Sequence, residues 1–305
     1  INCFMRVLFA DSNHPVLHEL LMAQGYVCDL FWDKPKEELE KLLPAYNALV
    51  LRSKFKITKE LLDKCPNLKC IGRVGAGMEN IDLEYAGKKN IVCLSAPEGN
   101  RDAVGEHAVF MLLSLMNNCN RSEAEIRAGN WLREASRGFE LKGKIVGIIG
   151  YGHMGRSFAR KLQGFEVNVI AYDKYKTGFT DQYAREVSME EIVKHSDVLS
   201  LHIPLTAETN EMVDDEYLFH FKKPIFLLNT ARGKVAKVQA ILNAIKQGKI
   251  LGAGLDVLEV EKYPALAEQS WYKELVQSGK VLLTPHVAGW TFESYRKLSE
   301  VLAEK

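Results

Sequence analysis

Short apolar runs alternate with stretches of mixed polarity over the first hundred residues of the chain. The apolar runs at 5–10, 26–31, 48–51, 70–74 and 91–94 predict β-strands, and the amphipathic stretches at 14–24 and 58–64 predict helices. Strands that alternate with helices indicate a parallel, doubly wound sheet. This part of the chain is therefore expected to form an α/β domain.

A second alternating series begins after Gly143. It predicts strands at 145–149, 167–172, 198–203, 225–229, 251–257 and 281–284, a helix from Arg156 to Leu162, and a last helix over 291–305. Between the two series, residues 102–127 predict one long helix. Its centre, Ala108 to Leu113, is apolar nearly all round, so this helix should be buried between domains or against another subunit. The pattern predicts two α/β domains with a cleft between them.

A glycine motif stands at the start of the second series. Gly150, Gly152 and Gly155 form G-x-G-x-x-G directly after the predicted strand 145–149 and open the next helix. Glycines at this spacing allow a tight turn, close approach of a pyrophosphate, and packing of helix on strand. The helix N-terminus also offers unpaired N–H groups to phosphate. The motif predicts a dinucleotide site.

Asp173 follows the next predicted strand, 18 residues beyond the last glycine of the motif. An acidic residue there can accept hydrogen bonds from the adenosine ribose and would repel a 2′-phosphate, which favours NAD over NADP. Lys174 and Lys176 are close in sequence and could tolerate that phosphate, so NADP stays open.

Composition narrows the class of protein. Lys and Arg number 40 against 39 Asp and Glu, so no broad basic field favours nucleic acid or an anionic membrane. The longest apolar stretch, 108–116, is too short to span a bilayer, and no signal peptide is evident. The six cysteines lack a C-x-x-C pair and metal-ligand spacing. We expect reduced, buried cysteines in a cytoplasmic protein without a metal site.

Three further segments leave predicted strands with reactive groups attached: 229–233, 256–261 and 285–289. With these segments, the chain resembles the D-isomer-specific 2-hydroxyacid dehydrogenase family. The resemblance is carried, in order, by 75–77 with 80–82, by 105–107, by the glycine motif and by the three segments. It implies a Rossmann NAD domain inserted into a flavodoxin-like substrate domain. The expected boundaries are 1–98 plus 286–305 for the substrate domain and 99–285 for the NAD domain, which includes the long helix as a dimerisation element.

The resemblance implies a catalytic trio of Arg232, Glu261 and His286. An arginine offers a fork of donors to the substrate carboxylate and the oxygen on C2. A histidine can exchange the proton of the C2 hydroxyl near neutral pH. A glutamate on the other ring nitrogen would fix the tautomer. Glu259 remains an alternative, because it lies two residues from Glu261. The family's spacing of five residues from Asp256 selects Glu261, although the usual proline after this glutamate is replaced by Lys262.

The same resemblance implies the cofactor contacts. Asp256 would meet the nicotinamide amide, and His107 is expected to be an interior histidine rather than a ligand. The residues expected to contact NAD are Gly150, Gly152, His153, Met154, Gly155, Asp173, Ile203, Thr230, Arg232, Asp256, His286 and Gly289.

The substrate carboxylate would meet the backbone amides of Gly75, Ala76 and Gly77. Arg52, Ser53 and Lys54 leave a strand at the same edge and could hold a phosphate, as the basic cluster of phosphoglycerate dehydrogenases does; a solvated loop with ordinary charges is the alternative. The substrate hypothesis is accordingly D-3-phosphoglycerate. No regulatory domain is expected after the last helix, which would complete the first domain.

Other interpretations stay open at this point. Glyoxylate or hydroxypyruvate reduction is the near alternative, and an NAD-sensing, corepressor-like binding module is the alternative of another class. Trp290, where relatives carry small residues, and Glu79, where aspartate is usual, weaken any transfer of substrate identity. Trp131 would anchor a homodimer interface or reach the partner's active site.

Overall fold

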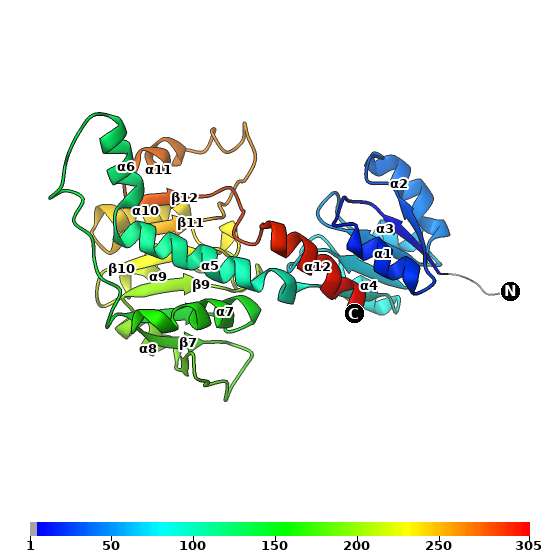
Figure 1. Ribbon diagram of the computed structural model, residues 1–305, viewed down its shortest axis with the longest axis horizontal. Helices are drawn as coiled ribbons and strands as arrows, with labels where there is room; N and C mark the ends of the chain where they lie inside the picture. Colours follow the sequence, from blue (N-terminus) through cyan, green and yellow to red (C-terminus); the bar gives the residue numbers. More distant parts are fainter. Residues whose placement is uncertain (1–4) are drawn as a thin grey trace. The chain divides into compact units, whose positions relative to one another are not determined.

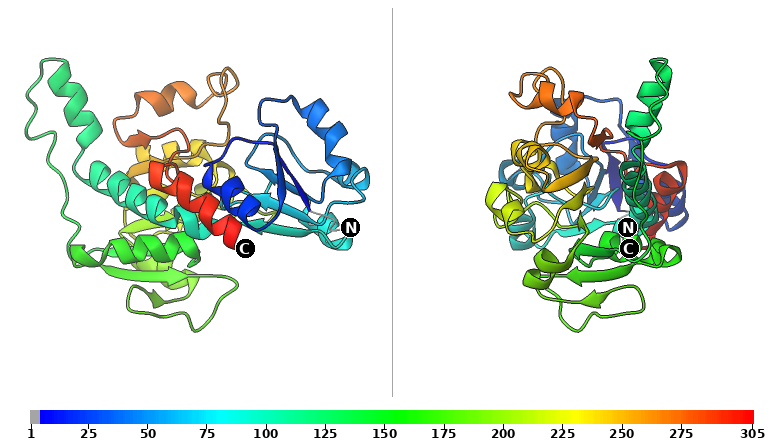
Figure 2. Two further views of the ribbon diagram at one scale, coloured as in Figure 1. Left: turned by 45° about the vertical axis from the view of Figure 1, so that its right-hand side comes forward. Right: turned by 90° about the vertical axis from the view of Figure 1, so that its left-hand side faces the viewer.

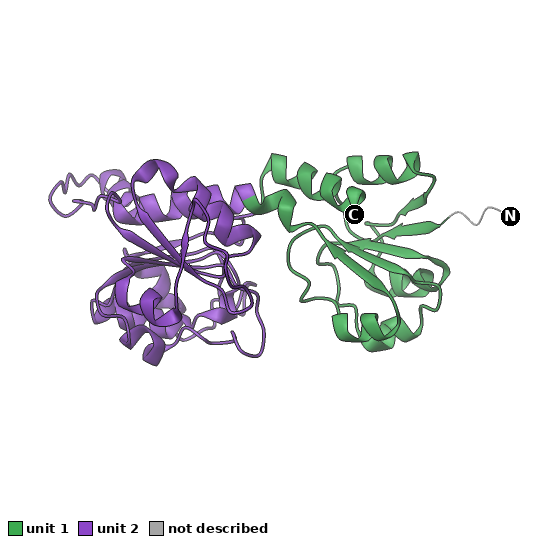
Figure 3. Cartoon of the chain, turned by 90° about the horizontal axis from the view of Figure 1, so that it is seen from below, with its two compact units in different colours: residues 1–101, 290–305 green, residues 102–289 purple. Residues whose placement is uncertain are grey.

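The computed structural model describes residues 5–305, and the chain divides into two compact units (Figure 3). Unit 1 comprises the described residues up to Arg101 together with Trp290–Lys305, and unit 2 comprises Asp102–Gly289. The domain boundaries expected after residues 98 and 285 each lie within a few residues of this division and stay a prediction. Residues 285–289 stay with unit 2 because the main-chain amides of Val287 and Ala288 donate hydrogen bonds to Asp256 of that unit.

Unit 1 is built on a five-stranded sheet in the order β2-β1-β3-β4-β5, with every neighbouring pair parallel. The order reverses at β1, which lies between β2 and β3. The elements are β1 (Arg6–Phe9), α1 (Val16–Ala23), β2 (Val27–Leu30), α2 (Lys36–Leu42), β3 (Ala48–Leu51), α3 (Lys59–Asp63), β4 (Cys70–Arg73), α4 (Leu83–Lys88), β5 (Val92–Ser95) and, from the end of the chain, α12 (Phe292–Glu304) (Figure 1).

Each face of this sheet is covered by its own helices. Leu17 of α1 and Leu298 and Leu302 of α12 pack on Phe9 and its neighbours on one face. The other face is covered by α2, α3 and α4. Helices α1 and α12 lie side by side (Figures 1 and 2). Unit 1 therefore takes one helical layer partly from residues 290–305.

Unit 2 holds a seven-stranded parallel sheet in the order β12-β11-β10-β9-β6-β7-β8, which reverses between β6 and β9. The elements are α5 (Pro97–Met116, whose first turn belongs to unit 1), α6 (Cys119–Arg127), β6 (Ile145–Ile149), α7 (His153–Lys161), β7 (Asn168–Tyr172), β8 (Arg185–Glu186), α8 (Met189–His195), β9 (Val198–Leu201), α9 (Asp215–Phe219), β10 (Ile225–Asn229), α10 (Val238–Lys246), β11 (Ile250–Leu255), α11 (Tyr272–Gln277) and β12 (Val281–Leu283).

The helices of unit 2 are also divided between the two faces of their sheet. Helices α5 and α7 pack on one face, and α8, α9, α10 and α11 on the other. Two parallel-sheet α/β domains are what the alternating pattern predicted, and this fold class is confirmed. In such sheets ligands bind beyond the carboxyl ends of the strands where the order reverses. These points are β1 and β3 in unit 1, and β6 and β9 in unit 2.

The single long helix expected over 102–127 is wrong in its extent. Helix α5 begins at Pro97 and ends at Met116, and Asn118 has a left-handed backbone (φ 50°) before α6 begins. Asparagine tolerates that conformation better than most residues, which permits the break. No residue of α6 is buried, and α6 with the segment after it stands away from the rest of unit 2 (Figure 2).

The cysteines are only partly as expected. Cys65 is buried, and burial raises the pKa of its thiol to about 11. Cys119, at the start of α6, is exposed, against the expectation of burial. Cys3 lies outside the described residues.

Candidate active site

The glycine motif forms the turn from β6 into α7. Gly150 has φ +92°, and a Cβ there would clash with the main chain of His202, at the end of β9. A Cβ at Gly155 would clash with the carbonyl oxygen of Gly150. A Cβ at Gly152, in contrast, would meet no described atom within 4 Å. Gly150 and Gly155 therefore allow the tight turn. Gly152 leaves an open face at the N-terminus of α7, which a pyrophosphate fits.

Asp173 follows β7 and lies beside this turn. Its Oδ2 accepts a hydrogen bond of 2.9 Å from the main-chain N–H of Tyr151. The two lysines that could have neutralised a 2′-phosphate have other partners: Lys174 pairs with Glu208 at 2.6 Å, and Lys176 donates to the carbonyl of Tyr151 at 3.1 Å. The position of a carboxylate among paired cations favours a ribose without that phosphate.

Other residues expected to contact NAD lie around the same sheet edge. His153 and Met154 begin α7, Ile203 follows β9, and Thr230 follows β10. The hydroxyl of Thr230 is buried, and no described residue accepts or donates a hydrogen bond to it. A buried hydroxyl in that position suits a polar ligand group.

Arg232 lies in a turn that Asn229 organises. The side chain of Asn229 accepts a hydrogen bond from the N–H of Ala231 and donates one to the carbonyl of Arg232, at 3.1 and 3.0 Å. Gly233 then passes so close to the carbonyl of Leu258 that a Cβ would clash with it. This close approach brings the turn that bears Arg232 against the segment that leads to Glu261.

Glu261 and His286 meet. His286 Nδ1 is 2.9 Å from Glu261 Oε2, and each side chain is just under half exposed. The hydrogen bond to Glu261 is the largest influence on the imidazole and raises its pKa; burial and the charge of Arg232 act in the opposite direction. The structure thus brings together the three residues expected to be catalytic.

Glu259 has a different partner. Its Oε1 accepts a hydrogen bond of 2.6 Å from the N–H of Val238, the first residue of α10. An acidic side chain there satisfies an unpaired helix N–H and interacts favourably with the helix dipole. Of the two glutamates that the sequence left open, Glu261 faces the imidazole and Glu259 caps a helix.

Asp256, expected at the nicotinamide, is almost fully buried. Its two carboxylate oxygens accept hydrogen bonds of 2.9 Å from the N–H groups of Val287 and Ala288. The carboxylate therefore organises the segment that carries His286. Its contact with NAD stays a prediction.

In unit 1, the segment expected to bind phosphate surrounds Asp11. This aspartate follows β1, and its Oδ2 accepts hydrogen bonds from the main-chain N–H groups of Arg52, Ser53 and Lys54 at 2.6, 3.0 and 3.1 Å. The ammonium of Lys54 donates to the carbonyls of Ala10 and Trp32, at 3.1 and 2.5 Å. These amides and this ammonium therefore already have hydrogen-bond partners within unit 1.

Arg52 is placed differently from Lys54. Its guanidinium carbon lies 4.1 Å from the centre of the Trp290 ring, a cation–π contact within unit 1. Nearby, a Cβ on Gly75 would clash with the guanidinium of Arg73, whose Nε donates to the carbonyl of Arg52 at 3.2 Å. Two arginines therefore lie by the segment that includes Gly75, Ala76 and Gly77.

Sequence reasoning missed several residues of these sites. Asp11, Asn229 and Thr284 were not singled out, since each acts on a segment distant in sequence or on main-chain atoms. His202 was also missed: its Nε2 lies 2.8 Å from Ser200 Oγ, and burial of the ring lowers its pKa to about 4. No motif marked any of them.

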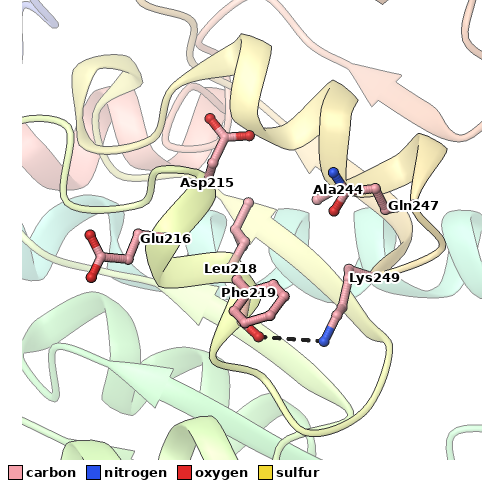
Figure 4. Close-up of a pocket in the computed structure, with 7 residues that line it drawn as sticks. All are labelled: Asp215, Glu216, Leu218, Phe219, Ala244, Gln247 and Lys249. Carbon is pink, nitrogen blue, oxygen red and sulfur yellow. Dashed lines mark hydrogen bonds between the residues drawn. The ribbon is translucent and has the colours of Figure 1, made fainter.

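A small hollow lies elsewhere on unit 2, between α9 and α10 (Figure 4). Lys249 there donates to the carbonyl of Phe219 at 3.4 Å. None of the residues expected at the active site lines it. Its lining residues are Asp215, Glu216, Leu218, Phe219, Ala244, Gln247 and Lys249.

Over residues 5–305, no group of three or more His, Cys, Asp or Glu side chains is arranged to hold a metal ion. Within that same stretch, every helix is too short or too polar to cross a membrane.

Comparison with known proteins agrees with the geometry. Residues 109–288 match the family model described as "D-isomer specific 2-hydroxyacid dehydrogenase, NAD binding domain". The hydroxypyruvate reductase of Thermotoga maritima is 35% identical over 270 residues, which are 88% of this chain and 87% of that protein. The D-3-phosphoglycerate dehydrogenase of Archaeoglobus fulgidus is 32% identical over 98% of this chain, which spans 56% of that longer protein.

Among solved structures, the D-lactate dehydrogenase of Aquifex aeolicus complexed with NAD and lactic acid superposes with a TM-score of 0.84. It is 29% identical, and the match covers 98% of this chain and 93% of that one.

Proposed function

The chain belongs to the D-isomer specific 2-hydroxyacid dehydrogenase family, and on that premise we propose that it interconverts 3-phosphohydroxypyruvate and D-3-phosphoglycerate. As a member it is an NAD-dependent oxidoreductase that acts on CH–OH groups. In this proposal, residues of unit 2 carry out the redox chemistry, and residues of unit 1 recognise the anionic groups of the substrate.

His286 supplies and removes the proton. In reduction, the imidazolium gives a proton to the oxygen on C2 as that carbon receives a hydride, and in oxidation the neutral ring takes the hydroxyl proton back. Glu261, 2.9 Å from Nδ1, stabilises the imidazolium and leaves Nε2 for the substrate. Arg232 directs its guanidinium to the carboxylate and the C2 oxygen.

NADH, when bound, supplies the hydride. The open face at Gly152, the carboxylate of Asp173 and the buried hydroxyl of Thr230 are the features that would hold its pyrophosphate, adenosine ribose and nicotinamide end.

Arg52 is the observation that supports a phosphorylated substrate. A guanidinium stacked on the Trp290 indole keeps its N–H edge available for an anion, because the contact uses the face of the planar group. The loop of Gly75, Ala76 and Gly77 would bind the carboxylate. Arg52 would then bind the phosphate at the other end of the three-carbon chain.

Asp11 favours the second candidate, reduction of hydroxypyruvate. Its carboxylate accepts hydrogen bonds from the main-chain N–H groups of Arg52, Ser53 and Lys54. A phosphate at this position would therefore be repelled by the carboxylate and would have no available N–H donors. Under this alternative, Arg52 would meet the C3 hydroxyl or water.

A substrate panel tests the proposal. Purified protein is assayed with NADH and 3-phosphohydroxypyruvate, hydroxypyruvate, glyoxylate or pyruvate, and with His286→Ala as the inactive control. We expect kcat/KM to be at least about tenfold higher for the phosphorylated acid than for hydroxypyruvate, as one charge-assisted hydrogen bond would give. Equal values would favour hydroxypyruvate reduction. Tight NADH binding without turnover of any acid would favour an NAD-sensing binding module.

The proposal includes a homodimer formed through α5, α6 and the segment after them. Large apolar side chains there are exposed: Phe110, Ile126, Trp131, Leu132 and Phe139 are 45–82% exposed. Large apolar side chains that gather on one exposed surface mark an interaction site, and we propose that these form one. Sedimentation equilibrium should give twice the chain mass, and Ile126→Arg should shift it to the monomer; a wild-type monomer at micromolar concentration would contradict the dimer.

A further inference from the structure

A chain of hydrogen bonds runs beneath the segment that carries His286. His107, on α5, has its Nε2 3.1 Å from Thr284 Oγ1, and Thr284 Oγ1 is 2.5 Å from Asp256 Oδ1. Asp256 in turn accepts the N–H groups of Val287 and Ala288. The chain links a helix to the two residues that follow His286, and all of it lies within unit 2.

The direction of each hydrogen bond follows from the groups involved. An ionised carboxylate only accepts, so the single hydroxyl hydrogen of Thr284 is directed to Asp256. The oxygen of Thr284 then accepts from His107, which must carry a hydrogen on Nε2. Burial lowers the pKa of His107, so the ring is a neutral donor at neutral pH and not an acid or base for the substrate.

The segment held by this chain is strained. His286 has φ +56°, a left-handed conformation that costs energy in a residue with a Cβ. It is held there by its own N–H, which donates to the Asp256 carbonyl at 2.7 Å, and by the two amides on the Asp256 carboxylate. Its side chain reaches Glu261 from that conformation.

We propose that His107 is a positioning residue, which acts through Thr284 and Asp256 to hold His286 in its left-handed conformation against Glu261. The inference rests on the proposed acid–base function of His286. A neutral donor suits this task because it directs the Thr284 hydroxyl without adding a charge beside Asp256. Without that donor, the hydroxyl can rotate to other acceptors, and Asp256 loses a fixed partner.

The first test uses two matched pairs. Thr284→Val removes the hydroxyl and keeps the shape, whereas Thr284→Ser keeps the hydroxyl; His107→Leu removes the donor, whereas His107→Gln offers an amide N–H near the position of Nε2. We expect Thr284→Val and His107→Leu to lower kcat by about ten- to a hundredfold, with Ser and Gln recovering most of it, as expected when a catalytic group is displaced slightly. The double variant should be no worse than the poorer single variant.

Leu115→Ala, which removes buried volume from the same helix, controls for general destabilisation. It should lower Tm without changing kcat or the pH profile. If His107→Leu and Thr284→Val also change only Tm, the chain is merely structural and the proposal is overturned.

The second test needs no turnover. NMR titration of the His286 ring reports its pKa directly, and we expect a lower pKa in His107→Leu and Thr284→Val, because a displaced ring loses its contact with Glu261. The ¹⁵N shifts of His107 should show the Nε2–H tautomer. An unchanged His286 titration would overturn the positioning role. If the wild type reduces none of the oxo acids but the His286 pKa is lower in His107→Leu and Thr284→Val, the proposed function fails and the positioning role of His107 stands.

Discussion

The point where strand order reverses is treated differently in the two units. In unit 2, the turn after β6 leaves an open face at Gly152, where a Cβ would meet no described atom. In unit 1, the corresponding space beyond β1 and β3 holds the Asp11 carboxylate, which accepts three main-chain N–H groups. The same topology therefore leaves an open face at the turn of one unit and directs main-chain amides to an internal carboxylate in the other.

The difference shows that topology alone does not make a phosphate site. Both sheets direct loop amides to their reversal point, as parallel sheets do. One acidic side chain after β1, Asp11, is enough to accept the hydrogen bonds of those amides, which are then not available to a ligand. A basic sequence such as Arg52–Ser53–Lys54 then contributes one half-buried guanidinium, stacked on Trp290, rather than a cluster of cations.

The largest effect should come from Glu261, the carboxylate of unit 2 that contacts His286. Glu261→Gln removes the charge beside His286 and should lower kcat/KM about a hundredfold. Reduction requires the imidazolium, so activity is present below the His286 pKa and falls as pH rises through it. Glu261 raises that pKa, so in the variant the fall should move to lower pH.

Glu259→Gln is the matched control for this change. The amide oxygen can still accept the N–H of Val238, so the cap persists. Its pH–rate profile should be that of the wild type. A profile that moves in Glu259→Gln and not in Glu261→Gln would reverse the two assignments.

A smaller effect on KM should distinguish the role of Arg52 from that of Lys54 in unit 1. Arg52→Ala should raise KM for 3-phosphohydroxypyruvate about tenfold or more, the value of one charge-assisted hydrogen bond, and change KM for hydroxypyruvate by less than about twofold. Lys54→Met should leave both KM values unchanged and lower Tm, because its ammonium holds the carbonyls of Ala10 and Trp32. If Lys54→Met raises KM as much as Arg52→Ala, the two reversal points do not differ as described.

Much of the fold could be predicted because buried strands are short and continuously apolar. The run Ile145–Ile149 and the run Ile225–Asn229 were each predicted as strands with the bounds that the structure has. Helix limits were harder. The break at Asn118 depends on one left-handed residue, and nothing in the apolar pattern of 102–127 marks it.

The site could be predicted where chemistry and spacing coincide, as in the glycine motif. It could not be predicted where a carboxylate distant in sequence occupies the hydrogen-bond donors of a segment. Asp11 and Lys54 are separated by more than forty residues, and only the pairing of β1 with β3 brings them together. The choice between Glu259 and Glu261 likewise depended on where α10 begins.

The last helix gives the chain an unusual order of assembly. During translation, β1 to β5 emerge before unit 2, whereas α12, which supplies Leu298 and Leu302 to one face of their sheet, emerges after it. The segments of unit 2 are contiguous, so a nascent chain can complete that unit while the older part still exposes Phe9 and Val50. We therefore expect the middle of this protein to mature before its beginning, the reverse of the usual N-to-C order. Until then, the uncovered face is a surface for chaperones to protect.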